Sequence, residues 1–308
     1  IFSFSRVLGP LTKKEKFDVI HGNAEESYWT GKISKKNKSI YVFTSHTPNI
    51  PTTGMLKGIN RPVRFLKSIN TYFLRSAIIE ADHVVAFSKF SKDLIIKGVG
   101  DTCVNKLKII PPGVESSWFK VERKPSSNSE LLYWGRLEDE KGLPELFHAL
   151  EVVSKVIKDI NLTIVGEGKR LMDYKSLVAD LSLTDRVQFM GWLSSSKIQS
   201  LIAKSRLGLF PSRVESFGLS VVEAMAAGLP VIAASGGALQ ENVEKGVTGT
   251  LVPVNNAGAL AKAIISTLEN SKHTESMARD AKKLVQHKFN WDEAANKMVD
   301  LYSFSNGM

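Results

Sequence analysis

Residues 211–228, PSRVESFGLSVVEAMAAG, decide the fold that we predict for this chain. The apolar run 207–210, LGLF, leads into this stretch, and the run 229–233, LPVIA, follows it. Short apolar runs on either side of a helical segment are typical of buried strands joined by a crossover helix. The stretch therefore predicts a strand, a loop, a helix and a second strand, which is the repeating unit of a doubly wound α/β sheet.

Two carboxylates in this stretch, Glu215 and Glu223, have seven residues between them. If the helix begins near residues 216–218, Glu215 lies just before its first turn, where backbone N–H groups attract anions. Glu223 then lies about a turn and a half inside the helix. Gly218 would let a ligand come close to the backbone. The pattern predicts a site for an anionic ligand that carries hydroxyl groups.

The two carboxylates and the segment 224–231, AMAAGLPV, resemble the donor-site signature of the retaining GT-B glycosyltransferases of family 4, also called glycosyl transferases group 1. Two surface glutamates on an amphipathic helix are the alternative, because Glu is common in helices. The flanking residues favour the donor site. The likeness extends from about Phe17 to the end of the chain and is most specific over 135–253. It implies an α/β, GT-B chain with two Rossmann-like domains that face a cleft.

In the family, a strand, a glycine-rich loop and further strand–helix units come before the stretch that resembles 18–21, DVIH. No such units precede Phe17 here. We therefore expect a first domain that is incomplete at its N-terminus, and a chain that falls short of full activity as given. Residues 122–129 have the composition of a linker and predict a hinge. The predicted domains are 1–122 on the acceptor side, 123–289 for donor binding, and 290–308 as a helix that crosses back to the first domain.

The net charge of +10 is concentrated in the first domain. Residues 1–122 carry 19 Lys and Arg against 10 Asp and Glu, and the remaining residues carry 22 against 21. Such a surface suits anionic lipid headgroups, phosphorylated substrates or nucleic acid. A helix predicted over 54–81 holds Lys57, Arg61 and Arg64. It is either a solvated helix packed on its own sheet or a surface that sits on an anionic membrane, as in relatives with lipid acceptors.

A strand predicted at 39–44 carries His46 just beyond its C-terminal end, the edge where open α/β sheets bind ligands. A histidine after a strand is often structural, and we expect this of His21. In the family, however, a histidine at the place of His46 lies beside the transferred sugar and the acceptor. The resemblance therefore assigns His46 to the acceptor side. The single cysteine, Cys103, excludes an intramolecular disulfide and fits a reducing compartment.

The second domain alternates apolar runs with helix-length segments, which predicts a parallel sheet with right-handed crossovers. The predicted strands are 131–134, 162–165, 187–190, 207–210 and 231–234. After the first of them come Gly135, Arg136 and Lys141. Two cations beside a helix N-terminus can hold a diphosphate, Arg by bidentate bonds and Lys as a point charge. Together they resemble the diphosphate clamp of the family.

The resemblance also assigns the other donor contacts. Glu215 would hold hydroxyls of the transferred sugar, Glu223 those of the ribose, and the backbone at Gly218 and Leu219 the diphosphate. Turns at 166–167 and 190–192 would flank the ribose and the base. The predicted donor-binding residues are Gly135, Arg136, Lys141, Gly166, Glu167, Gly191, Trp192, Glu215, Phe217, Gly218, Leu219 and Glu223. The predicted catalytic residues are His46, Arg136, Lys141 and Glu215.

The implied reaction moves a hexose from a UDP- or GDP-sugar to a hydroxyl acceptor, a glycan or a lipid at a membrane surface, with retention. We expect no tightly bound cofactor and no essential metal, because the sequence has no Asp-x-Asp motif or His/Cys cluster. The expected location is the cytoplasm, peripheral on the membrane face. Alternatives are an epimerase or a phosphorylase relative of the same architecture, and a basic nucleic-acid- or nucleotide-binding protein without catalysis. The absence of a nucleic-acid recognition motif argues against nucleic acid as a partner.

Overall fold

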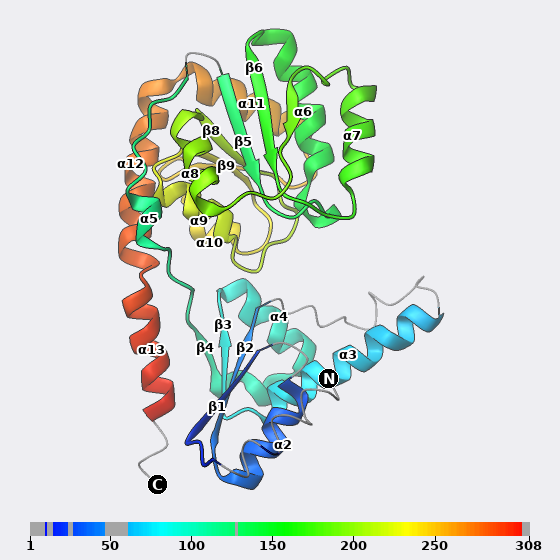
Figure 1. The fold of residues 1–308 in the computed structure, drawn as a ribbon, viewed down its shortest axis with the longest axis vertical. Helices are drawn as coiled ribbons and strands as arrows, with labels where there is room; N and C mark the ends of the chain where they lie inside the picture. The colour runs from blue at the N-terminus through cyan, green and yellow to red at the C-terminus, as the bar shows by residue number, and fades with distance from the viewer. Residues whose placement is uncertain (1–9, 11–14, 24–26, 47–60, 127–128, 304–308) are drawn as a thin grey trace. The chain divides into compact units, whose positions relative to one another are not determined.

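The computed structural model describes residues 10, 15–23, 27–46, 61–126 and 129–303. The chain divides into a first unit, Ile1–Pro112 with Asp292–Met308, and a second unit, Gly113–Trp291. Each unit is a parallel β-sheet covered by helices (Figure 1). The predicted domain limits, after residues 122 and 289, stay predictions.

The described part of the first unit holds four parallel strands, in the order β1-β2-β3-β4. The strands are β1 Val19–Asn23, β2 Ile40–Ser45, β3 His83–Ala86 and β4 Leu107–Ile109. The helices are α2 Tyr28–Asn37, α3 Arg61–Glu80, α4 Lys89–Val99, the 3₁₀ turn η3 Asp101–Lys106 and, at the end of the chain, α13 Trp291–Ser303. Residues 54–60 of the predicted basic helix lie outside the described residues, and α3 matches its remainder.

Alternate residues of the central strands of the first unit bury opposite faces of the sheet, as the period of a strand requires. Tyr41 and Phe43 of β2 pack on the side of α3 and α4. Val42 of β2 and Val85 of β3 face the other way and pack with Leu301 of α13. The last helix therefore completes the core of the first unit.

The second unit holds six parallel strands, in the order β10-β9-β8-β5-β6-β7. They are β5 Ser129–Trp134, β6 Ile160–Val165, β7 Val187–Phe189, β8 Leu207–Phe210, β9 Val231–Ala234 and β10 Thr250–Val252. The five predicted strands are present. The edge strand β10, three residues long, was not predicted, because so short a run carries no readable period.

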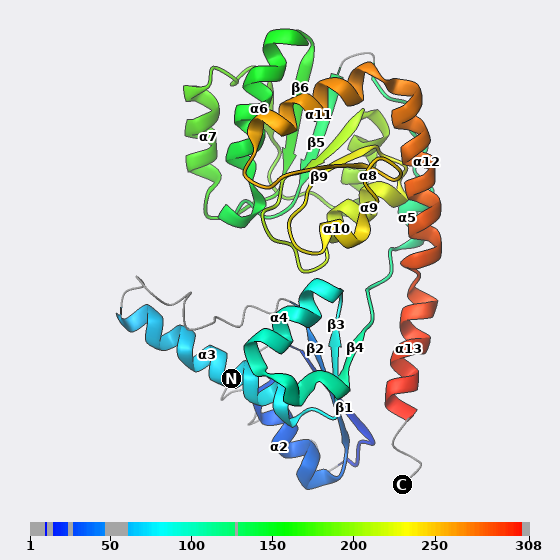
Figure 2. The ribbon, with the colours of Figure 1, turned by 180° about the vertical axis from the view of Figure 1, so that it is seen from behind.

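The helices of the second unit cover both faces of this sheet (Figure 2). They are α5 Ser116–Phe119, η4 Asp139–Lys141, α6 Leu143–Val156, α7 Leu171–Asp180, α8 Ser195–Lys204, α9 Leu219–Ala226, α10 Leu239–Asn242, α11 Ala257–Glu269 and α12 Ser271–Lys288. Helix α6 packs beside α11, and α9 packs beside α12 and α5. Within β5, Leu131 and Tyr133 join the core under α6 and α11. Trp134, the next residue after Tyr133, therefore points to the opposite face.

The C-terminal ends of the strands lie at one edge of the second sheet, and backbone hydrogen bonds connect the loops that leave them. The bonds run from Leu137 N to Glu167 O (2.8 Å), from Gly166 N to Gly191 O (2.8 Å), and from Arg213 N to Glu140 O (2.8 Å). Strand β5 lies between β6 and β8, so the chain order reverses beside it. In open α/β sheets the ligand crevice forms at this switch point. The loops after β5 and β8 are therefore the place to look for a site.

We predict that Gly142→Ala destabilises the protein more than Gly246→Ala. Both glycines have positive φ, +68° and +77°, where a Cβ costs about 1–2 kcal/mol. A Cβ at Gly142 would also overlap the carbonyl oxygen of Pro211, whereas Gly246 has no atom within 4 Å of that position. Crowding of this kind costs about 1–3 kcal/mol more. Urea unfolding of the two variants measures the difference, and equal losses would contradict the packing of the β5 loop against the β8 loop.

Candidate functional site

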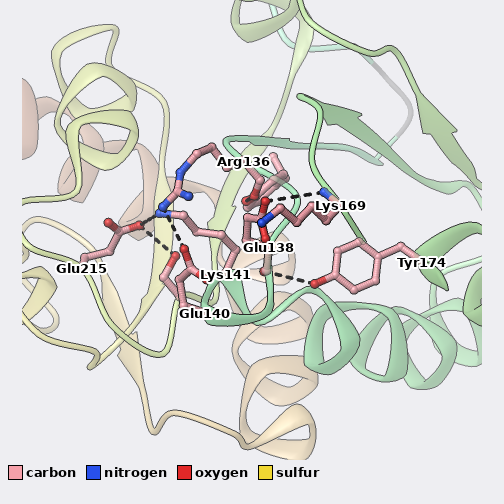
Figure 3. A network of polar contacts seen from close by, with 9 residues as sticks. Arg136, Glu138, Glu140, Lys141, Lys169, Tyr174 and Glu215 are labelled. Atoms are coloured by element: carbon pink, nitrogen blue, oxygen red, sulfur yellow. Dashed lines mark hydrogen bonds and ion pairs between the residues drawn. The ribbon is translucent and has the colours of Figure 1, made fainter. Parts of the chain in front are cut away.

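The loop after β5 places the two predicted cations in different surroundings. Lys141 Nζ lies 2.6 Å from Glu215 Oε1, and 13% and 19% of the two side chains are exposed. Arg136 Nη2 donates to Glu140 Oε1 at 2.8 Å, and 65% of the Arg136 side chain is exposed. Figure 3 shows Lys141 extended toward Glu215 and Arg136 beside Glu140. The structure thus joins Lys141 to Glu215 and leaves Arg136 at the surface.

The loop after β8 holds Glu215 with a second bond. Ser212 Oγ donates to the same Oε1 atom of Glu215 at 3.0 Å. Ser212 is 3% exposed. A carboxylate oxygen that receives both an ammonium and a hydroxyl donor is held in one position. Glu215 is therefore fixed between the loops after β5 and β8.

Helix α9 begins at Leu219 after Gly218, whose φ is +85°. A Cβ at Gly218 would overlap Cδ2 of Leu239, so internal packing as well as conformation requires the glycine. We had expected Gly218 to leave room for a ligand, and the structure supplies this different reason. Leu219 itself is 47% exposed. The first turn of α9 is therefore accessible beside Glu215.

Phe217 is buried below this turn. Its ring meets the ring of Phe289 edge to face at 5.3 Å. Its carbonyl oxygen accepts a hydrogen bond from Asn242 Nδ2 at 2.5 Å. Phe217 therefore supports the loop from inside, and a ligand contact at this position would involve its backbone.

Glu223 lies in α9 and faces an aromatic side chain. Its Oε2 accepts a hydrogen bond from Trp134 Nε1 at 3.0 Å. The pKa of Glu223 is raised to about 7: burial raises it most, the Trp134 hydrogen bond lowers it, and the charge of Glu115 adds a smaller rise. A carboxyl group of this kind changes its charge near neutral pH.

The two remaining predicted turns follow β6 and β7. Gly166 has a φ of +136°, and a Cβ there would overlap the carbonyl oxygen of Gly135. Glu167 is exposed, and 73% of Trp192 is exposed beside Gly191. These turns are joined to each other and to the β5 loop by the backbone bonds given above. They therefore form one continuous rim with Arg136 and Lys141.

A second ion pair anchors the β8 loop and was not expected from the sequence. Arg213 Nη2 donates to Glu145 Oε1 at 2.6 Å. Glu145 lies in the first turn of α6. The two residues are 68 positions apart in the sequence, so no local motif predicts that they form a pair. Ser212 and Trp134 were missed for a similar reason, since their partners are set by the packing of loops against strands.

His46 follows β2 in the first unit and is exposed. Its Nε2 lies 3.1 Å from Asn23 Oδ1, and its ring meets Phe87 edge to face at 5.1 Å. His21 has a different environment: its ring nitrogens lie 2.7 Å from the hydroxyls of Tyr302 and Thr44. Burial, and secondarily the charge of His46, lowers the pKa of His21. His21 thus links α13 to β2, in agreement with the structural role that we expected.

The described residues lack two features, a cluster of metal ligands and a membrane-spanning helix. No group of three His, Cys, Asp or Glu side chains in these ranges is gathered as a metal ion would require. No helix in the described part of the chain has the length and apolar character to cross a bilayer. Metal independence and membrane association both stay predictions. Cys103 is buried, and burial raises the pKa of its thiol.

The arrangement in the second unit suits an anionic ligand with hydroxyl groups. A cation, an exposed arginine and the start of a helix offer positive charge. Glu215 offers an ionic acceptor, and Glu223 an acceptor whose charge depends on pH. The other predicted donor residues line the adjoining turns.

Family profiles match almost the entire chain. The profile of the family "Glycosyl transferases group 1" matches residues 114–284, and that of "Glycosyltransferase Family 4" matches residues 1–118. An uncharacterized glycosyltransferase of Methanocaldococcus jannaschii is 27% identical in an alignment 309 positions long, which covers 94% of this chain and 76% of the relative. A glycogen synthase of Mycobacterium tuberculosis is 30% identical over 229 residues, 72% of this chain and 54% of the synthase.

Solved structures share the fold. Anabaena HepE, solved in complex with UDP, superimposes with a TM-score of 0.80 at 23% identity, over 98% of this chain and 82% of HepE. HepE has also been solved in complex with UDP-glucose. At this identity the likeness establishes the fold.

We predict that Glu223 makes the protein less stable as the pH rises from about 4.5 to about 7. The pKa of Glu223 is about 7 in the folded protein, against 4.5 for the free side chain. Within this window the folded state binds more protons than the unfolded state, so the free energy of unfolding falls with rising pH. The loss is at most about 3 kcal/mol. Glu223→Gln cannot ionise and should lose this slope in urea unfolding measured across the window.

Glu269→Gln is the matched control, because Glu269 lies exposed at the end of α11. This variant should retain the slope of the wild type. An unchanged slope in Glu223→Gln would show that Glu223 ionises normally in the folded protein.

Proposed function

This chain belongs to the glycosyl transferases group 1, and on that premise we propose that it moves a hexose from a nucleotide-diphosphate sugar to a hydroxyl acceptor with retention. Its two parallel-sheet units form a GT-B glycosyltransferase fold. The observation that carries the donor half of the proposal is the Lys141–Glu215 pair, 2.6 Å apart at the switch point of the second sheet. A cation and a carboxylate held side by side match a ligand with a charged diphosphate next to a sugar.

Lys141 is proposed to take the diphosphate. An ammonium group has three donors, and Glu215 receives one of them, so donors remain for phosphate oxygens. Arg136 is exposed on the same loop and can turn from Glu140 to the phosphate with bidentate bonds. The backbone at Gly218 and Leu219 adds the positive end of α9. Together these groups would stabilise the charge that develops as the diphosphate leaves.

The carboxylates are proposed to hold the hydroxyl groups of the donor. Glu215, fixed by Lys141 and Ser212, would accept hydrogen bonds from the transferred hexose. Glu223 would accept those of the ribose. The turns at Gly166–Glu167 and Gly191–Trp192 would flank the ribose and the base. UDP and GDP are the proposed nucleotides, and the UDP complexes of HepE support the first.

The chemical step is proposed to be a direct transfer. We assign no covalent nucleophile among the proposed site residues. The bond from the anomeric carbon to the diphosphate breaks while the acceptor oxygen bonds to the same face, and a phosphate oxygen of the leaving group takes the acceptor proton. The cations and the helix terminus would serve in place of a divalent metal. His46 is proposed to line the acceptor side, where it is exposed at the end of β2.

The acceptor is proposed to be a glycan or a lipid, met at the cytoplasmic face of a membrane. The excess of Lys and Arg in residues 1–122 supports this proposal. Lys57, and the side chains of Arg61 and Arg64, lie outside the described part of the structure. Arg75 of α3 is exposed beside Tyr72, which is 62% exposed.

We predict that one of UDP, GDP, ADP and dTDP raises the melting temperature of the protein. A ligand at 100 times its dissociation constant adds about 2.7 kcal/mol to the free energy of unfolding. Lys141→Ala and Glu223→Ala should lose this stabilisation. Lys155→Ala removes a lysine from an exposed pair at the other end of α6 and should keep it. With the matching sugar nucleotide and a methyl glycoside, the product should keep the anomeric configuration of the donor by proton NMR.

His46→Ala distinguishes donor binding from acceptor binding. The melting temperature of this variant should still rise with the nucleotide. In the transfer reaction the variant should release nucleoside diphosphate more slowly, because His46 is proposed to line the acceptor side. Absence of stabilisation by all four nucleotides, or an inverted product, would contradict the proposed function.

We predict that the protein binds vesicles that contain phosphatidylserine and not vesicles of phosphatidylcholine alone. Each basic residue near an anionic surface adds about 1 kcal/mol, so the triple change Lys57→Gln, Arg61→Gln and Arg64→Gln should release the protein from the vesicles in sedimentation. A matched triple change of Lys155, Lys175 and Lys197, on helices of the second unit, should have no effect. Unchanged binding of the first variant would remove the basis for a membrane acceptor.

A further inference from the structure

Trp134 is held rigidly at the end of β5. Only 5% of its surface is exposed. Trp118 of α5 lies stacked on it, with ring centroids 6.3 Å apart and planes 6° from parallel. Phe210 of β8 meets it edge to face at 5.0 Å. A ring enclosed by two others in this way keeps one orientation.

The polar atom of this ring is directed at the second carboxylate of the site. Trp134 Nε1 donates to Glu223 Oε2 at 3.0 Å. An indole N–H can only donate, so it favours the ionised carboxylate over the neutral acid. This hydrogen bond opposes the effect of burial, which raises the pKa of Glu223.

Other charges near Glu223 are few in the part of the chain that the structure describes. Of the groups on elements packed against α9, Glu115 at the start of α5 acts on Glu223 and raises its pKa. On α12, Glu275 pairs with Arg123, and Lys282 donates to the carbonyl oxygen of Phe119. Helix α10 carries Glu241, whose backbone carbonyl oxygen accepts a hydrogen bond from Lys288 Nζ. Strands β8 and β9 carry no charged residue.

We propose that Trp134 is a positioning residue for Glu223, whose carboxylate it holds where the vicinal hydroxyls of a ribose can donate to it. The inference rests on the proposed function, because that function supplies the nucleoside diphosphate. Trp134 itself need not touch the ligand. It acts through the orientation and the charge of Glu223.

The buried position of Glu223 makes nucleotide binding depend on pH near neutrality, and the Trp134 hydrogen bond sets where this dependence lies. An ionised carboxylate accepts from both hydroxyls, whereas the protonated acid brings a donor of its own. Binding should therefore weaken as the pH falls through about 7, the pKa of Glu223. Loss of the indole N–H raises the pKa of Glu223, so nucleotide binding should begin to weaken at a higher pH than in the wild type. Loss of the Glu115 charge lowers the pKa of Glu223, so nucleotide binding should begin to weaken at a lower pH.

The first experiment needs no ligand. The protein has five tryptophans, and their indole N–H resonances can be followed by ¹H–¹⁵N NMR after labelling. The resonance of Trp134 is identified by its loss in Trp134→Phe. It should shift with a midpoint near pH 7 in the wild type, at a lower pH in Glu115→Gln, and with no such midpoint in Glu223→Gln. A Trp134 resonance that is indifferent to Glu223→Gln would overturn the proposal.

The second experiment measures binding of UDP, GDP, ADP and dTDP by calorimetry between about pH 6 and about pH 8.5, which brackets the titration of Glu223. Trp134→Phe keeps an aromatic ring and removes the donor. It should bind the preferred nucleotide about tenfold more weakly at neutral pH, with a smaller loss at the alkaline end. Trp29→Phe, in α2 of the first unit, is the matched control and should bind as the wild type does.

A loss that is equal at every pH would mean that the ring only fills space, and it would overturn the positioning role. If the wild type binds none of the four nucleotides, the proposed function fails. The indole titration would still decide whether Trp134 holds Glu223.

Discussion

The contact between Lys141 and Glu215 is the interaction on which the proposed site depends. It joins the loop after β5 to the loop after β8, the two strands beside the switch point of the second sheet. Both side chains are largely buried, so removing one leaves the charge of the other without a partner, which costs more than an exposed pair would. Ser212 and the Arg213–Glu145 pair hold the same loop in place. The pair is therefore a structural link at the centre of the proposed ligand site.

The two carboxylates of the site differ because their surroundings differ. Glu215 accepts hydrogen bonds from an ammonium group and a hydroxyl. Glu223 faces an indole N–H and lies near Glu115, in a more apolar place. One motif with seven intervening residues thus delivers two acceptors of different character. The helix start at Gly218 separates them, with Glu215 before α9 and Glu223 inside it.

The sequence predicted most of this fold because its signals are local. The strands of the second unit are short apolar runs such as 207–210, and each is a strand in the structure. The resemblance assigned Lys141 and Glu215 to one donor site, but it did not predict that they form an ion pair. The Trp134–Glu223 bond, over 89 residues, was not predicted, because the direction of an indole depends on the packing of Trp118 and Phe210 around it. Gly218 was expected to leave room for a ligand, whereas its positive φ and its contact with Leu239 were not predicted.

The segment after Gly113 makes contacts that its composition does not reveal. Residues 122–129 have the composition of a linker, yet the described part of this segment is bound to the second unit. Arg123 donates to the carbonyl oxygen of Gly228 at 2.7 Å and pairs with Glu275, and Ser126 N donates to Lys204 O at 2.9 Å. Bending there would break these bonds and leave a largely buried guanidinium unpaired, at a cost of several kcal/mol. Helix α5 belongs to the same bound segment, so its Trp118 is held in place where it stacks on Trp134. Trp134 in turn donates to Glu223, and the position of Glu223 is therefore determined by contacts within the second unit.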